Sequence, residues 1–128
     1  MFTFMDLKLQ GKLAVVTGST GAGIGKEIAL EFARRGAIVV VNGSKISIVD
    51  SAVDDIAKEL KIASKNRVVG LSGDVGSETG VNAFIKQLEA VEEQIGKKVH
   101  VLVNNVGIFH SQDFVDVTDE KWMHYYQI

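Results

Sequence analysis

Four short apolar segments alternate along this chain with segments in which apolar residues recur at helical spacing, and this alternation constrains the fold most. The strand-like segments are Leu13–Thr17, Ala37–Val41, Arg67–Ser72 and Val99–Val103. Each is mainly apolar and rich in β-branched residues, which is typical of a strand buried on both faces. We therefore expect four strands that are buried on both faces rather than strands with one solvated face.

The segments that follow these strands indicate helices that bury one face, because their apolar residues lie three and four positions apart. The stripes run from Ile24 to Ala33, from Val49 to Leu60 and from Val81 to Ile95, and a last helix is expected after Thr118. Buried strands that alternate with one-faced helices predict an α/β fold, with a parallel sheet, right-handed crossovers and helices on both faces. The pattern fits one domain, or part of one.

The helix ends carry their own signals. Gly36 and Gly96 follow the first and third stripes, where a glycine commonly ends a helix in the left-handed conformation. Ser47 and Asp50 are spaced like a capping pair at the start of the second helix. Thr118 is placed to cap the last helix, and two carboxylates follow it in the first turn.

The first strand meets its helix through the glycine-rich segment Thr17–Gly25. Glycines at such a junction permit a tight turn, let the backbone approach a pyrophosphate, and let the helix pack close to the sheet. The helix N-terminus then offers free N–H groups and the positive end of its dipole to the phosphates. The segment therefore predicts a dinucleotide site, against the alternative of a flexible turn.

Two other phosphate-binding loops have glycine patterns similar to this segment. A P-loop needs a lysine and then serine or threonine after its second glycine, but Glu27 follows Gly25-Lys26 and Thr20 stands where the first glycine is needed. The loop of Rossmann-type methyltransferases is closer, but it is usually followed by an acidic residue at the end of the second strand. The segment Val41–Ser44 offers none, which leaves this alternative open but disfavoured.

Composition excludes several functional classes. The chain has 128 residues and a formal charge of -2, so no bulk attraction to nucleic acid is expected. It has no cysteine, so disulfides and cysteine nucleophiles are excluded. Its start, Met1–Asp6, lacks the pattern of a signal peptide, and no apolar run approaches the roughly 20 residues that span a membrane. The spacing of His100, His110 and His124 does not indicate a metal site. We expect a cytoplasmic protein with no nucleic-acid or membrane partner.

Four separated features together resemble the short-chain dehydrogenase/reductase family, over about Leu7 to Ile128. They are the glycine loop, Asp74-Val75 after the third strand, the segment Asn104–Gly107 after the fourth strand, and the helix that carries Trp122. The resemblance implies a Rossmann-type fold, of which about four strands of a larger doubly wound sheet are present. It implies a single NAD(P)-binding domain over residues 1–128, truncated at its C-terminal side.

The resemblance also implies which residues bind the cofactor. They are Gly18, Ser19, Thr20, Gly23, Ile24, Gly25, Ser44, Lys45, Asp74, Val75, Asn105, Val106 and Gly107. In the family the aspartate meets the adenine ring, the first asparagine ties neighbouring strands together, and the backbone after it borders the cofactor ribose. Asp74 has the alternative of capping the following helix, and Asn104 and Asn105 the alternative of ordinary turn formers.

The end of the second strand predicts NADP(H) in preference to NAD(H). Family members that prefer NAD generally place an aspartate there to bind the ribose hydroxyls, and the aligned residue here is Gly43. No carboxylate repels a 2′-phosphate, and Ser44 with Lys45 can hold one. The alternative is that Lys45 is a solvated loop charge.

Two departures from the family pattern bear on function. The glycine loop has four residues, Ser19–Ala22, where the family has three between its first glycine and Gly-Ile-Gly, so the loop must bulge or shift. The catalytic serine and the Tyr-x-x-x-Lys pair of the family lie beyond a chain of this length, and neither Tyr125 nor Tyr126 has a lysine four residues on.

The chain as given is therefore expected to be inactive and to bind cofactor weakly. The whole protein is expected to act on a small-molecule carbonyl or alcohol substrate of undetermined identity and to form a homo-oligomer. Two explanations of the length stay open, a fragment of a longer enzyme and a short paralogue that binds nucleotide or a partner without catalysis.

Overall fold

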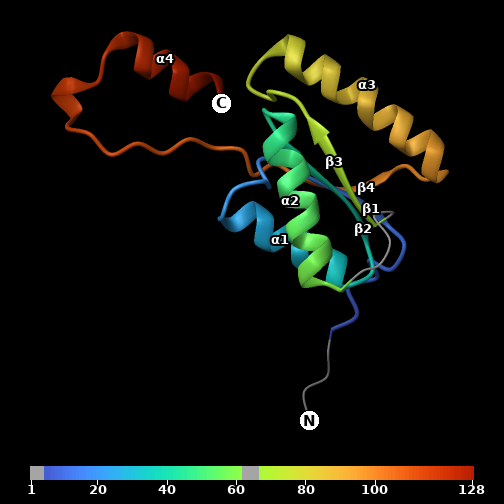
Figure 1. The fold of residues 1–128 in the computed structure, drawn as a ribbon. Coiled ribbons are helices and arrows are strands. Elements are labelled where there is room, and N and C mark those ends of the chain that lie inside the picture. Colours follow the sequence, from blue (N-terminus) through green and yellow to red (C-terminus); the bar gives the residue numbers. More distant parts are fainter. Residues whose placement is uncertain (1–4, 62–66) are drawn as a thin grey trace.

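The computed structural model describes residues 5–61 and 67–128 and has four strands and four α-helices (Figure 1). The expectation about the chain start falls partly on residues 1–4, outside the described residues. The elements in chain order are β1 Leu13–Val16, α1 Ile24–Arg34, β2 Ile38–Gly43, α2 Ile46–Glu59, β3 Val68–Ser72, α3 Glu78–Ile95, β4 Val99–Val103, the 3₁₀ turn η2 Phe114–Asp116, and α4 Asp119–Gln127. Among the described residues, no helix is both long and apolar enough to cross a membrane.

The four strands form one sheet in the order β3-β2-β1-β4, and every neighbouring pair is parallel. Parallel neighbours need a crossover between them, and each crossover here contains a helix. The α/β fold with a parallel sheet is thereby confirmed. The register between β1 and β4 shifts between Leu13 and Ala14, which leaves an irregularity at the start of β4.

Successive side chains of β1 face opposite sides of the sheet, and both sides are covered. Ala14 and Val16 lie in the core layer shared with α1 and α2, whereas Leu13 and Val15 lie in the layer shared with α3. All four side chains are at most 1% exposed. Full burial of a valine or leucine side chain stabilises the fold by about 1.5–3 kcal/mol. The continuous apolar runs follow from this two-sided burial.

The helix ends agree with the sequence at three places and differ at one. Gly36 and Gly96 have φ of +88° and +68° and follow α1 and α3, and the Thr118 hydroxyl accepts a hydrogen bond from the Lys121 amide at 3.3 Å. The capping pair predicted from Ser47 is wrong, because α2 begins at Ile46 and the residue before it is Lys45, without a side-chain cap. Only Ser44 and Lys45 separate the end of β2 from the start of α2, so Ser47 lies within the first turn.

The C-terminal part of the chain is less covered than the rest. The expectation of a fourth strand buried on both faces is wrong, because no residue of β4 is fully buried. Leu102 of β4 pairs in register with Val15 and so faces the α3 side, but its side chain is 58% exposed. In Figure 1, α4 stands apart from the sheet at the end of an extended segment, and none of its residues is buried. The aromatic residues Trp122 and Tyr126 are 50% and 90% exposed.

Replacement of two serines tests the assignment of the helix caps. The Ser77 hydroxyl accepts a hydrogen bond from the Gly80 amide at 3.1 Å and caps α3, so Ser77→Ala should lower the free energy of unfolding by about 1 kcal/mol. Ser47→Ala is the matched control and should change it by less than about 0.5 kcal/mol. Urea denaturation of both variants measures the difference. An equal loss in both variants would contradict the assignment.

Candidate functional site

The residues predicted to bind the cofactor follow the carboxyl ends of the four strands. The glycine loop follows β1, Ser44 and Lys45 follow β2, Asp74-Val75 follows β3, and Asn105–Gly107 follows β4. Because all strands are parallel, these ends meet at one edge of the sheet. From β1 the chain crosses first toward β2 and β3, and later to β4 on the other side. Ligands of open α/β sheets bind at such a reversal of strand order.

Two glycines of the loop are required by the fold itself. Gly18 has a φ of +60°, and a Cβ there would lie 3.0 Å from the Val106 side chain. Gly25 is more crowded, because a Cβ would lie 2.6 Å from the Gly18 carbonyl oxygen and 2.3 Å from the Asn105 amide nitrogen. The first glycine therefore makes the tight turn, and Gly25 allows α1 to approach the end of β1.

Gly21 and Gly23 differ from these two glycines, because a Cβ on either would meet no atom within 4 Å. Neither has a positive φ. Residues 21–24 are exposed, and the Ile24 side chain is 75% exposed. The additional residue of the loop is therefore accommodated in this open stretch, and the space above Gly23 is free for a ligand.

Asn105 fastens the end of β4 to the end of β1. Its side-chain amide donates to the Thr17 and Gly18 carbonyl oxygens at 3.1 and 3.0 Å, and its backbone N–H donates to the Thr17 hydroxyl at 3.0 Å. The resemblance implied that the first asparagine, Asn104, makes this tie. The structure corrects this, because Asn104 is exposed while Asn105 makes the contacts. The alternative of an ordinary turn former also fails for Asn105.

The first residues of the loop also bond to β2, through a residue that the sequence analysis missed. Asn42 is 1% exposed, and its side-chain oxygen accepts a hydrogen bond from the Gly18 amide at 3.4 Å. The Ser19 hydroxyl, predicted to face the cofactor, is buried and donates to the Val16 carbonyl oxygen at 2.7 Å. Ser19 therefore faces the protein interior. A polar residue that ends the apolar run of β2 was the available signal.

At the end of β2 the backbone is covered by the glycine loop. A Cβ on Gly43 would lie 2.7 Å from the Thr20 hydroxyl oxygen, so Thr20 stands over the position where a longer side chain would begin. Ser44 and Lys45 are exposed. Lys45 precedes α2 without capping it through its side chain, so both side chains are accessible from the same edge of the sheet.

Asp74 turns its carboxylate back on its own loop. One carboxylate oxygen accepts a hydrogen bond from the Gly76 amide at 3.0 Å, while Ser77 caps α3. The alternative that the Asp74 side chain caps this helix is therefore wrong. Asp74 is exposed and Val75 is half-buried, which leaves both beside the edge where the strands end.

One charged pair lies next to the loop. The Lys26 ammonium, in the first turn of α1, lies 2.8 Å from a carboxylate oxygen of Asp55 on α2. The hydrogen bond and charge of Lys26 hold the pKa of Asp55 below its ordinary value. The pair links the two helices on one face of the sheet, but its exposure limits its stabilising effect.

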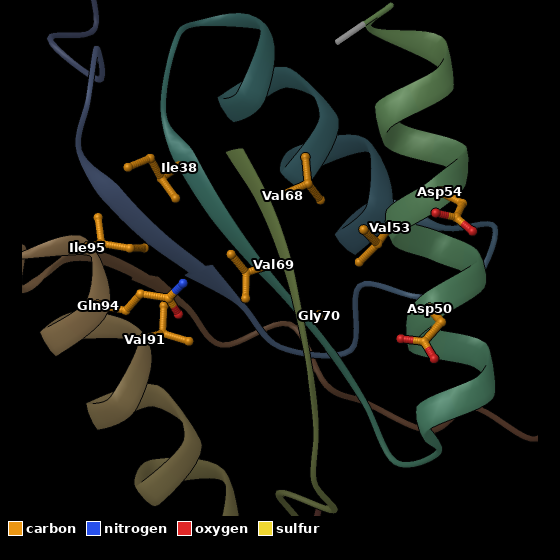
Figure 2. A pocket seen from close by; sticks show the side chains of 10 residues that line it. All are labelled: Ile38, Asp50, Val53, Asp54, Val68, Val69, Gly70, Val91, Gln94 and Ile95. Carbon is orange, nitrogen blue, oxygen red and sulfur yellow. The ribbon is translucent and has the colours of Figure 1, made fainter. Parts of the chain in front are cut away.

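A hollow of about 910 Å³ lies away from these residues, along the edge of β3 between α2 and α3 (Figure 2). It is lined by Ile38, Asp50, Val53, Asp54, Val68, Val69, Gly70, Val91, Gln94 and Ile95. None of the predicted cofactor residues lines it. Across residues 5–61 and 67–128, no group of three or more histidines and carboxylates has the arrangement of a metal site.

Comparison with known proteins identifies the family to which the chain is similar. A protein-family model described as short chain dehydrogenase matches residues 12–128. The chain is 37% identical over 124 residues to the uncharacterized oxidoreductase YvrD of Bacillus subtilis, covering 97% of this chain and 43% of that protein. It is 37% identical over 116 residues to the 3-oxoacyl-(acyl-carrier-protein) reductase FabG of Pseudomonas aeruginosa, covering 91% of this chain and 43% of that protein.

Solved structures show the same similarity. The L-sorbose reductase of Gluconobacter frateurii, in complex with NADPH and L-sorbose, superimposes with a TM-score of 0.77 and 32% identity. The match covers 96% of this chain and 43% of the reductase. This chain thus spans less than half the length of the relatives that it matches.

The contrast between the loop glycines can be tested by two alanine substitutions. Gly25→Ala should lower the free energy of unfolding by about 1–3 kcal/mol, because the new Cβ has no room between the Gly18 carbonyl oxygen and the Asn105 side-chain amide. Gly21→Ala is the control and should leave it unchanged or raise it by about 0.4–1 kcal/mol. Denaturant titrations of the two variants give the values. A tolerated Gly25→Ala would mean that α1 is not held against β1 as described.

Proposed function

The chain belongs to the short-chain dehydrogenase family, and we propose that it holds the nicotinamide cofactor of an NAD(P)-dependent oxidoreductase. The proposed reaction transfers hydride between the cofactor and a carbonyl or secondary-alcohol substrate. The observation that carries the proposal is the meeting of four strand-end loops at one edge of the sheet, beside the N-terminus of α1. Nucleotides bind at that edge in parallel α/β sheets.

The residues at this edge fit a dinucleotide. Gly21 and Gly23 leave the space above the loop open, and no side chain caps the start of α1. The first N–H groups of the helix can therefore donate to phosphate oxygens. We assign the pyrophosphate to Gly18–Gly25, the adenine to Asp74-Val75, the adenine ribose to Ser44 and Lys45, and the nicotinamide ribose to Asn105–Gly107.

The chemistry needs groups in addition to those of this chain. The bound cofactor supplies or accepts hydride, and an acid must protonate the developing alkoxide. A free tyrosine has a pKa of about 10, so it serves at neutral pH only beside a cation that lowers its pKa. By resemblance we place the serine and the Tyr-x-x-x-Lys pair in the part of the relatives' length that this chain does not match. The 128-residue chain alone is then inactive.

A second candidate function uses the same strand-end loops for binding alone. A short paralogue with the same edge would bind nucleotide or a protein partner without catalysis. The two candidates differ in the residues that the gene encodes after Ile128, and an intact mass of the purified protein compared with its gene distinguishes them.

We further propose that NADP(H) binds more tightly than NAD(H). Gly43 brings no carboxylate to the end of β2, and Thr20 occupies the place where a longer side chain would start. The exposed Lys45 ammonium can form a charge-assisted hydrogen bond with a 2′-phosphate. The L-sorbose reductase with a similar fold was solved with NADPH, which favours the same choice.

Assay of the full-length protein with both cofactors tests the function and the preference together. Carbonyl reduction should proceed with a lower KM for NADPH than for NADH. Lys45→Ala should raise the KM for NADPH about tenfold, the equivalent of one charge-assisted hydrogen bond, and should leave the KM for NADH unchanged.

Lys97→Ala, a change of the same kind outside the site, is the control and should alter neither KM. Tighter binding of NADH would defeat the preference. A full-length sequence that lacks the serine and the Tyr-x-x-x-Lys pair would defeat the enzyme proposal and favour the non-catalytic paralogue.

Finally, we propose a cytoplasmic homo-oligomer. We also propose that the 128-residue chain self-associates through its exposed β4 edge and through α4, which carries Trp122, Tyr125 and Tyr126. An apolar open edge invites pairing with another chain, and Leu102 is 58% exposed there. The apparent mass in light scattering should rise with concentration, and Leu102→Lys should reduce the rise. Ile85→Lys, on the exposed side of α3, is the control. A monomer at every concentration would contradict the proposal.

A further inference from the structure

We propose that Asn42 is a positioning residue for the cofactor, because its buried side chain holds the first turn of the glycine loop against the ends of β2 and β3. The inference rests on the proposed function, since it concerns how that binding edge is kept in shape. Asn42 does not touch the open side of the loop. It acts through Gly18 and Ser19.

The side chain of Asn42 joins three segments that are far apart in the sequence. Its oxygen accepts a hydrogen bond from the Gly18 amide at 3.4 Å. Its nitrogen donates to the carbonyl oxygens of Leu71 at 3.3 Å and Gly73 at 3.1 Å. The Asn42 side chain is 1% exposed, so these three bonds take up its hydrogen-bonding groups away from solvent. The ends of β1, β2 and β3 are therefore fixed relative to one another through one carboxamide.

This arrangement requires a carboxamide of this length. Asparagine offers one acceptor and two donors on a single short side chain, which matches one amide and two carbonyl groups. Aspartate has no donor and would bring a buried charge opposite two carbonyl oxygens. An aliphatic residue of similar size would leave the Leu71 and Gly73 carbonyl oxygens without this donor in a buried place.

The backbone of Asn42 fastens the same loop a second time. The Ser19 N–H donates to the Asn42 carbonyl oxygen at 2.9 Å, and the Asn42 N–H donates to the Ser19 hydroxyl at 3.0 Å. Beyond Ser19 the loop has few contacts, because Gly21 and Gly23 stand in open space. The position of the open stretch is therefore set by the turn that Asn42 holds.

The bonds of Asn42 align the glycine loop with the residues that follow β2. Residue 42 is directly followed by Gly43, over which Thr20 of the loop lies. The loop that faces the pyrophosphate and the residues that face the adenine ribose are thus joined at a single buried point. Loosening of that point should weaken cofactor binding without altering any group that contacts the cofactor.

Asn42→Ala in the full-length protein tests the inference, with Val40→Ala as the matched control. Val40 lies on the same strand, is fully buried and packs in the layer on the α3 side, so its truncation destabilises the protein without contact to the loop. Two quantities are measured under conditions of equal unfolding free energy. They are hydrogen exchange at the Gly18 and Ser19 amides without nucleotide, and the Kd for NADPH.

Relative to the control, Asn42→Ala should raise the exchange rate of both amides and the Kd each about tenfold, as expected for one buried hydrogen bond. Asn42→Ser, which keeps one hydroxyl in place of the carboxamide, should give a smaller change in the same direction and serves if the alanine variant does not fold. Equal exchange in Asn42→Ala and Val40→Ala would overturn the inference. So would faster exchange with an unchanged Kd.

Failure of the proposed function gives a different result from failure of this inference. If the unsubstituted protein binds neither NADPH nor NADH, the cofactor assignment falls and the role of Asn42 toward the cofactor falls with it. The exchange comparison still decides whether Asn42 holds the loop, because it needs no nucleotide.

Discussion

The close approach of α1 to the end of β1 is the constraint on which the rest of this structure depends. Gly25 faces the Gly18 carbonyl oxygen and the Asn105 amide at distances that leave no room for a Cβ. Because the helix begins at Ile24, its N-terminus is brought directly over the strand end. The positive end of the helix dipole and its free N–H groups then face the edge where the other three strands also end. A side chain at residue 25 would push α1 away from the end of β1 and so separate the groups that meet at this edge.

The arrangement of elements could be predicted from the sequence because it depends on local patterns. Residues 13–16 are apolar without interruption since both faces of β1 are covered. The predicted bounds Val99–Val103 are also confirmed, although no residue of β4 is fully buried. Gly36 and Gly96 signalled helix ends because left-handed backbone favours glycine. The failed cap at Ser47 shows the limit of a local pattern, since the position of α2 is set by the end of β2 and by the need to bury Val49.

The polar contacts of the site were less predictable, because their partners lie far away in the sequence. Asn105 bonds to Thr17 across 88 residues, and Asn42 bonds to Gly73 across 31. No local spacing distinguishes Asn105 from Asn104, and the choice depends on which side chain faces β1. The inward turn of Ser19 follows from the same geometry, because its hydroxyl completes the pairing of the loop with β2. Local patterns therefore predicted which loops meet at the carboxyl ends of the strands, but not the polar groups that hold these loops together.

The glycines of the loop serve two different purposes, and the structure separates them. Gly18 and Gly25 are needed by the folded chain, since one has a positive φ and the other has no space for a side chain. Gly21 and Gly23 have neither restriction, so the fold gives no reason for four glycines in this segment. A bound pyrophosphate would give one, because a Cβ at Gly23 would stand in the space that it needs beside the helix N-terminus. The unexplained glycines are thus the part of the loop that argues for a ligand, while the crowded ones argue only for the fold.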